Sequence, residues 1–105
     1  MSLPSELELL SAWWSAEEGA WITHFEATYP GETFCRSEVR VSSAAMAGVG
    51  IGHRGEGRDA EGIDAVVAAA RDQLLEILER EGRPVSLVVT MGTDGWKVIK
   101  RGYPG

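Results

Sequence analysis

The chain contains a single cysteine, Cys35, among its 105 residues. One cysteine excludes an internal disulfide and a zinc site built from several thiolates, and it favours a reducing, cytoplasmic setting. Long apolar runs are also missing, because no segment approaches the ~18 consecutive apolar residues that a membrane-spanning helix needs. The N-terminus lacks the basic start and apolar block of a secretory signal. We expect one cytoplasmic domain over residues 1–105, with no metal, cofactor or membrane contact.

Basic residues are scarce in the first third of the chain. Residues 1–35 contain no lysine or arginine, but they contain Glu6, Glu8, Glu17, Glu18, Glu26 and Glu32. The net charge of the whole chain is −6, and both lysines lie near the C-terminus. An acidic front repels phosphate backbones and favours basic protein surfaces. We therefore expect a protein partner, with a homodimer as an alternative, rather than nucleic acid.

Catalytic motifs are absent as well. The sequence has two histidines and contains no HExxH, GxSxG or P-loop pattern. Each of these motifs brings a nucleophile, a metal or a phosphate to a fixed geometry, and nothing in the chain replaces them. The sequence therefore favours a non-catalytic protein.

Residues 5–19 are predicted to form a first helix. Ser5 and Glu8 fit a capping box, in which each side chain satisfies an unpaired backbone donor of the first turn. One apolar stripe of this helix would contain Leu7, Leu10 and Trp14. Gly19 is placed to end the helix, because glycine readily adopts the conformation that terminates helices.

A second apolar line on the same predicted helix consists of Leu9 and Trp13. One interpretation is a wide helix that faces the core with both lines. The other is a contact surface for a partner or a second copy, with aromatic anchors inside an acidic rim. In that interpretation the partner-binding residues are Leu9, Trp13, Glu6 and Glu17.

Two alternating segments, residues 20–29 and 33–42, are predicted to form a hairpin. A three-residue turn, Pro30-Gly31-Glu32, aligns the apolar residues on one face and the charged residues on the other, whereas a two-residue turn mixes them. The predicted pairs are Trp21–Val41, Thr23–Val39, Phe25–Ser37, Ala27–Cys35 and Tyr29–Thr33 on one face, and His24–Glu38 and Glu26–Arg36 on the other. This register places Cys35 in the core and His24 on the opposite face, which excludes a Cys–His nucleophilic pair.

The second half of the chain contains the strongest helical pattern. Asp59 is the expected N-cap, and Gly82 follows the expected last turn. The predicted apolar stripe is Ile63, Val66, Val67, Ala70, Leu74, Ile77 and Leu78. Residues 85–91 and 96–101 then form a hairpin. The sequence thus predicts an α+β fold of order α-β-β-β-α-β-β, with two helices packed on one face of an antiparallel sheet.

Residues 48–59, GVGIGHRGEGRD, are rich in glycine and contain one GxGxxG match. A dinucleotide site needs the helix to begin at the second glycine, and here the apolar helical pattern begins only near Ile63. We therefore favour a purely conformational role for these glycines. The alternative is a regulatory site for an anion or a small ligand, formed by His53, Arg54 and Arg58.

The segment GEGRDAEGIDAVVAAARDQLLEIL, with the expected α-β-β-β-α order over residues 5–81, resembles the double-stranded-RNA-binding domain. In that family, lysines at the start of the second helix bind phosphates. The matching positions here are Asp59, Ala60, Glu61 and Gly62. The resemblance implies a similar topology without RNA binding, since only Arg54 and Arg58 remain to hold a phosphate.

The main hypothesis from the sequence is a small, acidic, non-catalytic protein that binds another protein. Its partner would be basic and would process nucleic acid, as for an inhibitor, an immunity protein or an anti-defence protein; this is an analogy of general character. The alternatives are a small-ligand or anion site on residues 48–59, and a nucleic-acid binder similar to the double-stranded-RNA-binding domain.

Overall fold

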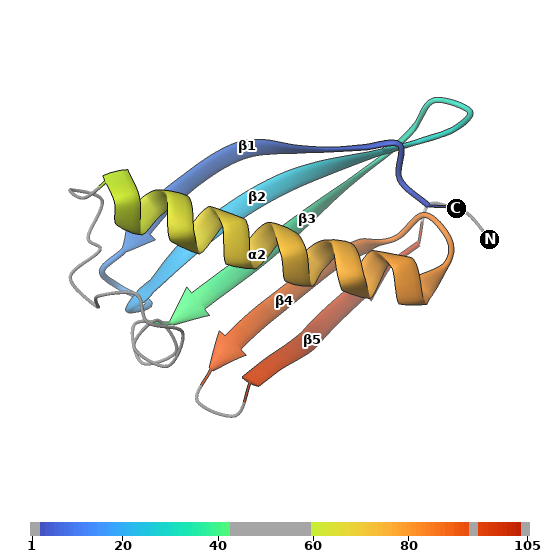
Figure 1. Ribbon diagram of the computed structural model, residues 1–105. Helices are drawn as coiled ribbons and strands as arrows, with labels where there is room; N and C mark the ends of the chain where they lie inside the picture. The colour runs from blue at the N-terminus through green and yellow to red at the C-terminus, as the bar shows by residue number, and fades with distance from the viewer. Residues whose placement is uncertain (1–2, 43–59, 93–94, 104–105) are drawn as a thin grey trace.

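The computed structural model describes residues 3–42, 60–92 and 95–103. They form one helix and a five-stranded sheet of spatial order β1-β2-β3-β4-β5 (Figure 1). The elements in chain order are β1 (Glu6–Ser15), β2 (Ala20–Tyr29), β3 (Thr33–Ser42), α2 (Ala60–Glu81), β4 (Ser86–Gly92) and β5 (Gly95–Gly102). The predicted α+β class is confirmed, but the described chain contains one helix where two were expected.

The sheet is mixed rather than antiparallel. Strands β1, β2 and β3 follow one another as antiparallel neighbours, and so do β4 and β5. Strands β3 and β4 are parallel, and their paired residues extend from Glu38↔Val88 to Val41↔Met91. A strand–helix–strand connection returns the chain to the end from which it started, so the crossover through α2 makes these two strands parallel.

The first predicted helix is wrong, because residues 6–15 form the edge strand β1. A β-bulge between Leu9 and Ser11 inserts one extra residue and changes which face the following side chains occupy. Leu7 and Trp14 therefore lie on the same face although they are an odd number of residues apart. The bulge turned a period of two into a spacing that resembles a helical stripe.

The hairpin of β2 and β3 has the predicted register at every pair. The three-residue turn is also confirmed: Gly31 has φ +89° and Glu32 has φ +63°. Cys35 is buried in the core, as expected. His24 contacts Glu38 and Arg36 contacts Glu26 on the opposite face.

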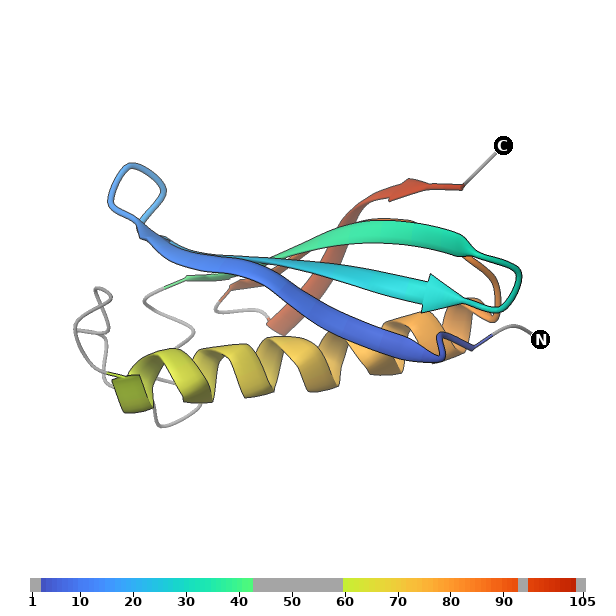
Figure 2. The same ribbon diagram turned by 90° about the horizontal axis from the view of Figure 1, so that it is seen from above.

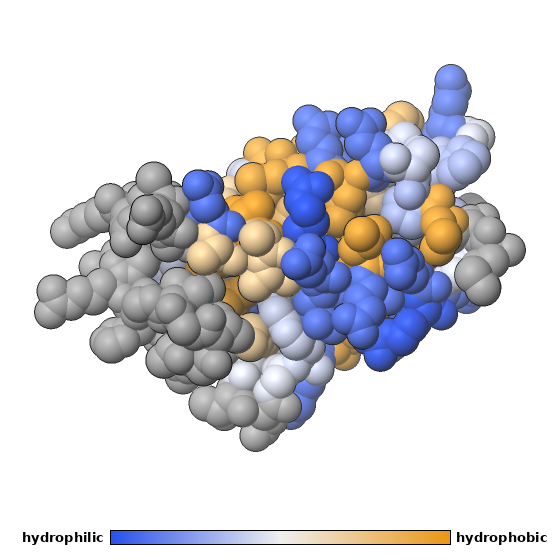
Figure 3. Space-filling model, viewed as in Figure 1, coloured by the Kyte–Doolittle hydropathy of each residue, from blue (hydrophilic) through white to orange (hydrophobic). Residues whose placement is uncertain are grey.

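Helix α2 covers one face of the sheet, and the predicted apolar stripe is confirmed from Val66 onward. The core between helix and sheet contains Trp21, Phe25, Tyr29, Val39, Val41, Val66, Leu74, Leu78, Leu87 and Val89. Gly82, at φ +67°, ends the helix and donates its N–H to the carbonyl of Leu78 at 3.1 Å. Figure 3 shows hydrophilic residues over the C-terminal half of α2, with apolar surface visible between α2 and β1.

Candidate functional site

The face of the sheet opposite α2 is not covered by any element among the described residues (Figure 2). We call it the open face. Alternation along the paired strands assigns to it Glu6, Glu8, Trp13, Ile22, His24, Glu26, Phe34, Arg36, Glu38, Arg40, Val88, Lys97 and Lys100. A solvent-facing sheet surface is usually polar. On the open face, large apolar side chains lie among the charged ones: Trp13 is 42% exposed and Phe34 is 58% exposed.

Trp13 is held in place by a network of side chains that crosses three strands. The Trp13 and His24 rings form a T-shaped contact, with a centroid distance of 5.0 Å and an interplanar angle of 82°. His24 Nε2 donates to Glu38 Oε1 at 2.8 Å, and Arg40 Nε donates to the other carboxylate oxygen. Arg40 also bonds Glu18 Oε1 at 3.1 Å. The network fixes the geometry around Trp13, one of the exposed aromatic side chains of the open face.

The network stabilises the ionised form of Glu38. Burial alone would raise the pKa of its carboxyl group, but the hydrogen bonds from His24 and Arg40 and their charges outweigh burial, so the pKa is lowered. The negative charge of Glu38 is therefore shared between two neighbours and is not presented alone to solvent.

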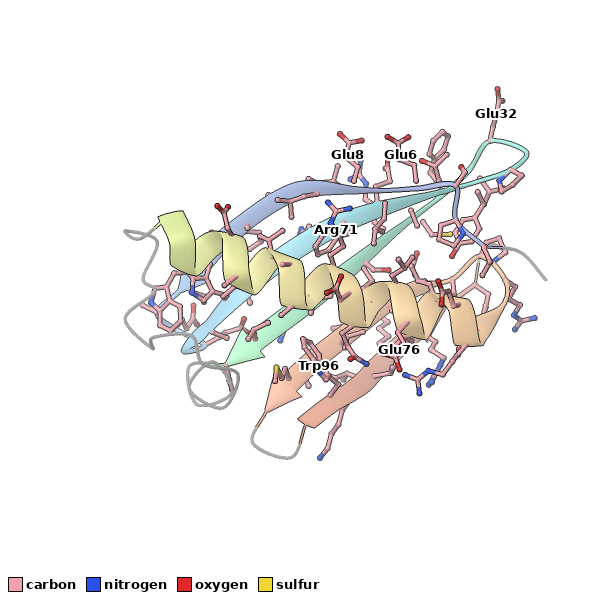
Figure 4. All side chains as sticks on the ribbon, viewed as in Figure 1. Glu6, Glu8, Glu32, Arg71, Glu76 and Trp96 are labelled. Carbon is pink, nitrogen blue, oxygen red and sulfur yellow. The ribbon has the colours of Figure 1, made fainter. Side chains whose placement is uncertain are left out.

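The open face has an acidic side and a basic side. Glu6 and Glu8 project from the edge strand β1, and neither makes an ion pair with a residue that the structure describes (Figure 4). Lys97 and Lys100 lie on β5 at the opposite edge. Potential therefore changes sign across the width of the sheet.

The continuous acidic front expected from the sequence is not present. Glu26 bonds Arg36 at 3.3 Å, and Glu18 bonds Arg40. Glu32 lies at the far tip of the turn between β2 and β3 (Figure 4). The arginines that neutralise these glutamates come from β3, beyond the stretch of sequence that lacks basic residues. What remains is a smaller acidic strip along β1.

The sequence-predicted partner residues are separated by the strand geometry. Leu9 pairs with the core residue Phe25 and packs on the core, whereas Trp13 lies on the open face. Glu6 lies on the open face, and Glu17 is exposed in the turn after β1. Trp13 and Glu6 therefore share one surface, Glu17 lies at its end, and Leu9 lies on the other face.

The predicted anion-binding residues, His53, Arg54 and Arg58, lie outside the described residues. Within residues 3–42, 60–92 and 95–103 no group of histidine, cysteine, aspartate and glutamate side chains could hold a metal ion. In the same part of the chain no helix is long and apolar enough to cross a membrane. Cys35 and His24 occupy opposite faces of the sheet, so they do not form a catalytic pair.

A hollow of about 420 Å³ lies on the open face, where β3 and β4 separate. We call it the sheet hollow. Its lining includes Leu10, His24, Glu38, Arg36 and Lys100. Backbone pairing of β3 with β4 begins only at Glu38↔Val88, and before that point Ser37 Oγ accepts the N–H of Leu87 at 3.0 Å.

Sequence reasoning missed the sheet hollow and its residues. Leu10 was assigned to the core stripe of a helix, and the bulge instead leaves it 41% exposed on the open face. Lys100 and Arg36 lie far apart in the sequence and meet only through the parallel pairing of β3 and β4. The signal available in the sequence was the strand–helix–strand order, which is the kind of connection that a parallel pair requires.

Both edges of the sheet are protected against pairing with another strand. Arg71 reaches from α2 across the Phe25 ring, 5.5 Å from its centroid, and donates to the carbonyl of Leu7 on the edge strand β1. Each edge strand also contains a bulge, and β5 carries Lys97 and Lys100. Bulges, lysines and covered carbonyls are devices that prevent edge-to-edge association. The open face lacks such protection.

A second hollow, of about 490 Å³, lies between the C-terminal half of α2 and β5. Trp96 and Ile77 contribute apolar surface to it, and Arg101 bonds Glu81 across it at 3.3 Å. Glu81 also accepts a hydrogen bond from Tyr103 at 2.8 Å. These contacts tie the end of the chain to the end of the helix, which gives this hollow a structural role.

Comparison with protein-family models, with curated proteins and with solved structures found no match to this chain. The resemblance to the double-stranded-RNA-binding domain is not supported, since that topology begins with a helix and this chain has β1 there. Arg54 and Arg58, the two cations that the resemblance left to hold a phosphate, lie outside the described residues. The open face is therefore the basis for inferring a function.

Proposed function

We propose that this protein is a non-catalytic binding module whose open face docks onto a basic surface of another protein. The observation that carries the proposal is an uncovered sheet face on which Trp13, 42% exposed, packs against His24, and His24 is itself hydrogen-bonded to Glu38. Aromatic side chains that are already fixed in position lose little conformational freedom on binding, and they dominate the energy of many interfaces.

Trp13 is placed to act as the central anchor. Its cross-strand neighbour Ile22 is buried to 3% exposure although it lies on the open face, since Trp13 and Arg40 flank it. Leu10, 41% exposed, lies on the same strand as Trp13, in the β-bulge between Leu9 and Ser11. These side chains form an apolar centre with charged residues on both sides, which is the usual composition of a protein–protein interface.

The acidic strip along β1 favours a partner with a positively charged surface. Glu6 and Glu8 border the apolar centre on β1, and Glu17 is exposed at the opposite end of that strand. Charges at the rim of an interface steer association and choose between partners, more than they add affinity. A basic protein, such as one that processes nucleic acid, therefore fits this side of the open face.

The test begins with affinity capture from cells of the source organism, followed by binding measurements on the protein identified. Trp13→Ala is expected to weaken binding by about thirtyfold, as for a central anchor. Ile99→Ala is the matched control, because Ile99 is 59% exposed at the β5 edge, and it should change affinity by less than about twofold. Circular dichroism verifies that both variants fold.

The charge component is tested separately with the double variant Glu6→Gln/Glu8→Gln. It should slow association at low salt and reduce the salt dependence, with little effect on dissociation. Association that is insensitive to salt, together with equal effects of Trp13→Ala and Ile99→Ala, would overturn the proposal. Capture of only further copies of this chain would also overturn it, since the open face would then be a self-association surface.

A further inference from the structure

We propose that the sheet hollow is a binding site for a small amphipathic carboxylate, a molecule with one carboxylate group and an apolar body. Most residues that line the site come from β3, β4 and β5, whereas Trp13 lies on the edge strand β1. It is a second site on the open face, which adjoins the surface around Trp13 at Leu10 and His24, and ligand binding there does not require the protein partner proposed above.

The hollow exists because small residues meet where two strands separate. Ser86 and Gly102 are cross-strand partners, and both line the hollow without filling it. Ser37 bridges β3 to Leu87 through its hydroxyl group at 3.0 Å, in place of backbone pairing at this level. The resulting volume of about 420 Å³ falls within the size range of small-molecule sites in proteins.

The polar groups of the hollow favour a single negative charge. Lys100 and Arg36 line it from β5 and β3. Arg36 contacts Glu26 through Nε at 3.3 Å, and a guanidinium group carries further N–H donors for a carboxylate. Glu38 also lines the hollow, but its charge is held by His24 and Arg40.

The balance of charge distinguishes a carboxylate from a phosphate. Two cations line the hollow, while the ionised Glu38 would repel a second negative charge brought close to it. A carboxylate needs only one compensating cation and matches the forked geometry of arginine. Inorganic phosphate is therefore the competing probe in the test.

The apolar groups of the hollow accommodate the rest of the ligand. Leu10 lines it from the side of β1, and Val88 lies directly across from Lys100 on the neighbouring strand. A carboxylate at Lys100 and Arg36 would leave an apolar body against Val88 and Leu10. Apolar surface with a few convergent polar groups is the usual composition of a small-molecule site.

The experiment is a titration of the isotope-labelled protein, followed by NMR amide shifts, with 4-phenylbutanoate as the probe. We expect saturable shifts centred on Val88, Lys100 and Gly102. The neutral isostere 4-phenylbutanamide should bind about fivefold more weakly than 4-phenylbutanoate, because it lacks the charge that Lys100 and Arg36 recognise. Inorganic phosphate should produce no saturable shift at these amides.

Two variants and one control locate the site. Lys100→Gln should weaken 4-phenylbutanoate about fivefold. Lys97→Gln is the control, since Lys97 lies on the same strand and face but does not line the hollow, and it should leave the affinity within about twofold. Gly102→Val should weaken binding, because a Cβ at Gly102 has no atom nearer than the Ser86 carbonyl oxygen at 4.0 Å, and the valine side chain would occupy part of the hollow beside Lys100.

Equal binding of the carboxylate and the amide would overturn the proposal, and so would shifts that centre on β1. Saturable binding of phosphate at the same amides would replace the proposed ligand class. If Gly102→Val does not fold, the contrast between Lys100→Gln and Lys97→Gln still decides. None of these outcomes bears on the effect of Trp13→Ala on a protein partner, so the two proposals fail separately.

Discussion

The hydroxyl group of Ser37 connects the two parallel strands at the point where they separate, and its removal gives a sharp prediction. Ser37 is 5% exposed, and its Oγ accepts the N–H of Leu87 at 3.0 Å. Ser37→Ala deletes the acceptor and leaves a buried backbone donor without a partner. The change in shape is small, so the lost hydrogen bond is the main consequence.

The expected loss of stability in Ser37→Ala is large for a single hydrogen bond, because one buried partner stays behind without a partner of its own. Leaving a buried N–H unsatisfied costs about 1–3 kcal/mol. For a chain of this length, each kcal/mol lowers the Tm by roughly 4–8 °C. Thr23→Val is the matched control, because Thr23 Oγ1 donates to the Val39 carbonyl at 2.9 Å and Thr23 is also buried. Thr23→Val removes the hydroxyl group that donates to the Val39 carbonyl oxygen, and valine keeps the β-branched shape of threonine. A carbonyl oxygen can accept a second hydrogen bond, so this loss should cost less than about 1 kcal/mol of the free energy of unfolding.

Urea denaturation of the three proteins measures the free energies of unfolding, and hydrogen exchange follows the Leu87 amide directly. Ser37→Ala should show a lower urea midpoint and faster exchange at Leu87, while Thr23→Val keeps both close to the parent protein. Equal midpoints for the two variants, with unchanged protection of the Leu87 amide, would refute the reasoning. Ligand binding in the sheet hollow provides a second measurement, since Ser37 and Leu87 both line the hollow.

Four further outcomes are expected. Gly82→Ala forces a side chain into φ +67° at the helix end and should lower the free energy of unfolding by about 1–2 kcal/mol in thermal denaturation. Glu32→Gly relieves φ +63° in the turn and should stabilise the protein by about 0.5–1 kcal/mol, measured in the same way. The folded-state pKa of Glu38 is lowered, so its contribution to stability is present above the ordinary glutamate pKa and is lost as pH falls through the folded value; urea midpoints between about pH 3 and pH 7 should therefore fall less in Glu38→Gln than in the parent. Burial raises the pKa of the Cys35 thiol, so a thiol reagent should modify it only at the rate of unfolding, and a fast reaction of the native protein would contradict its position in the core.

The part of the fold that could be predicted is the part in which local pattern and pairing agree. The β2–β3 register was predictable because only one turn length separated the apolar face from the charged face, as for Phe25–Ser37 against Glu26–Arg36. Helix α2 was predictable because its stripe continues over several turns and ends at Gly82. Neither prediction needed knowledge of distant parts of the chain.

The first strand could not be identified from its own pattern, because the bulge at Leu9–Ser11 interrupts the alternation. Contacts with β2, such as the pairing of Trp14 with Trp21, favour a strand here, and these contacts form only in the tertiary structure. The candidate site was predictable only in part for the same reason. Trp13 and Glu6 were proposed as surface residues of a helix that does not form, and the same reasoning wrongly placed Leu9 beside Trp13; Lys100 and Arg36 come together through a pairing that no local pattern contains.

The parallel seam between β3 and β4 has a consequence for the order in which this molecule assembles. All other strand pairs join neighbours along the chain, while Ser37 and Leu87 are separated by 50 residues. Closing so long a loop costs entropy before any contact forms, so we expect the two hairpins to form early and the pairing of β3 with β4 to be the slow step. Substitutions at Val39 and Val89 should then retard folding, whereas those near the tip of the β2–β3 hairpin should mainly hasten unfolding.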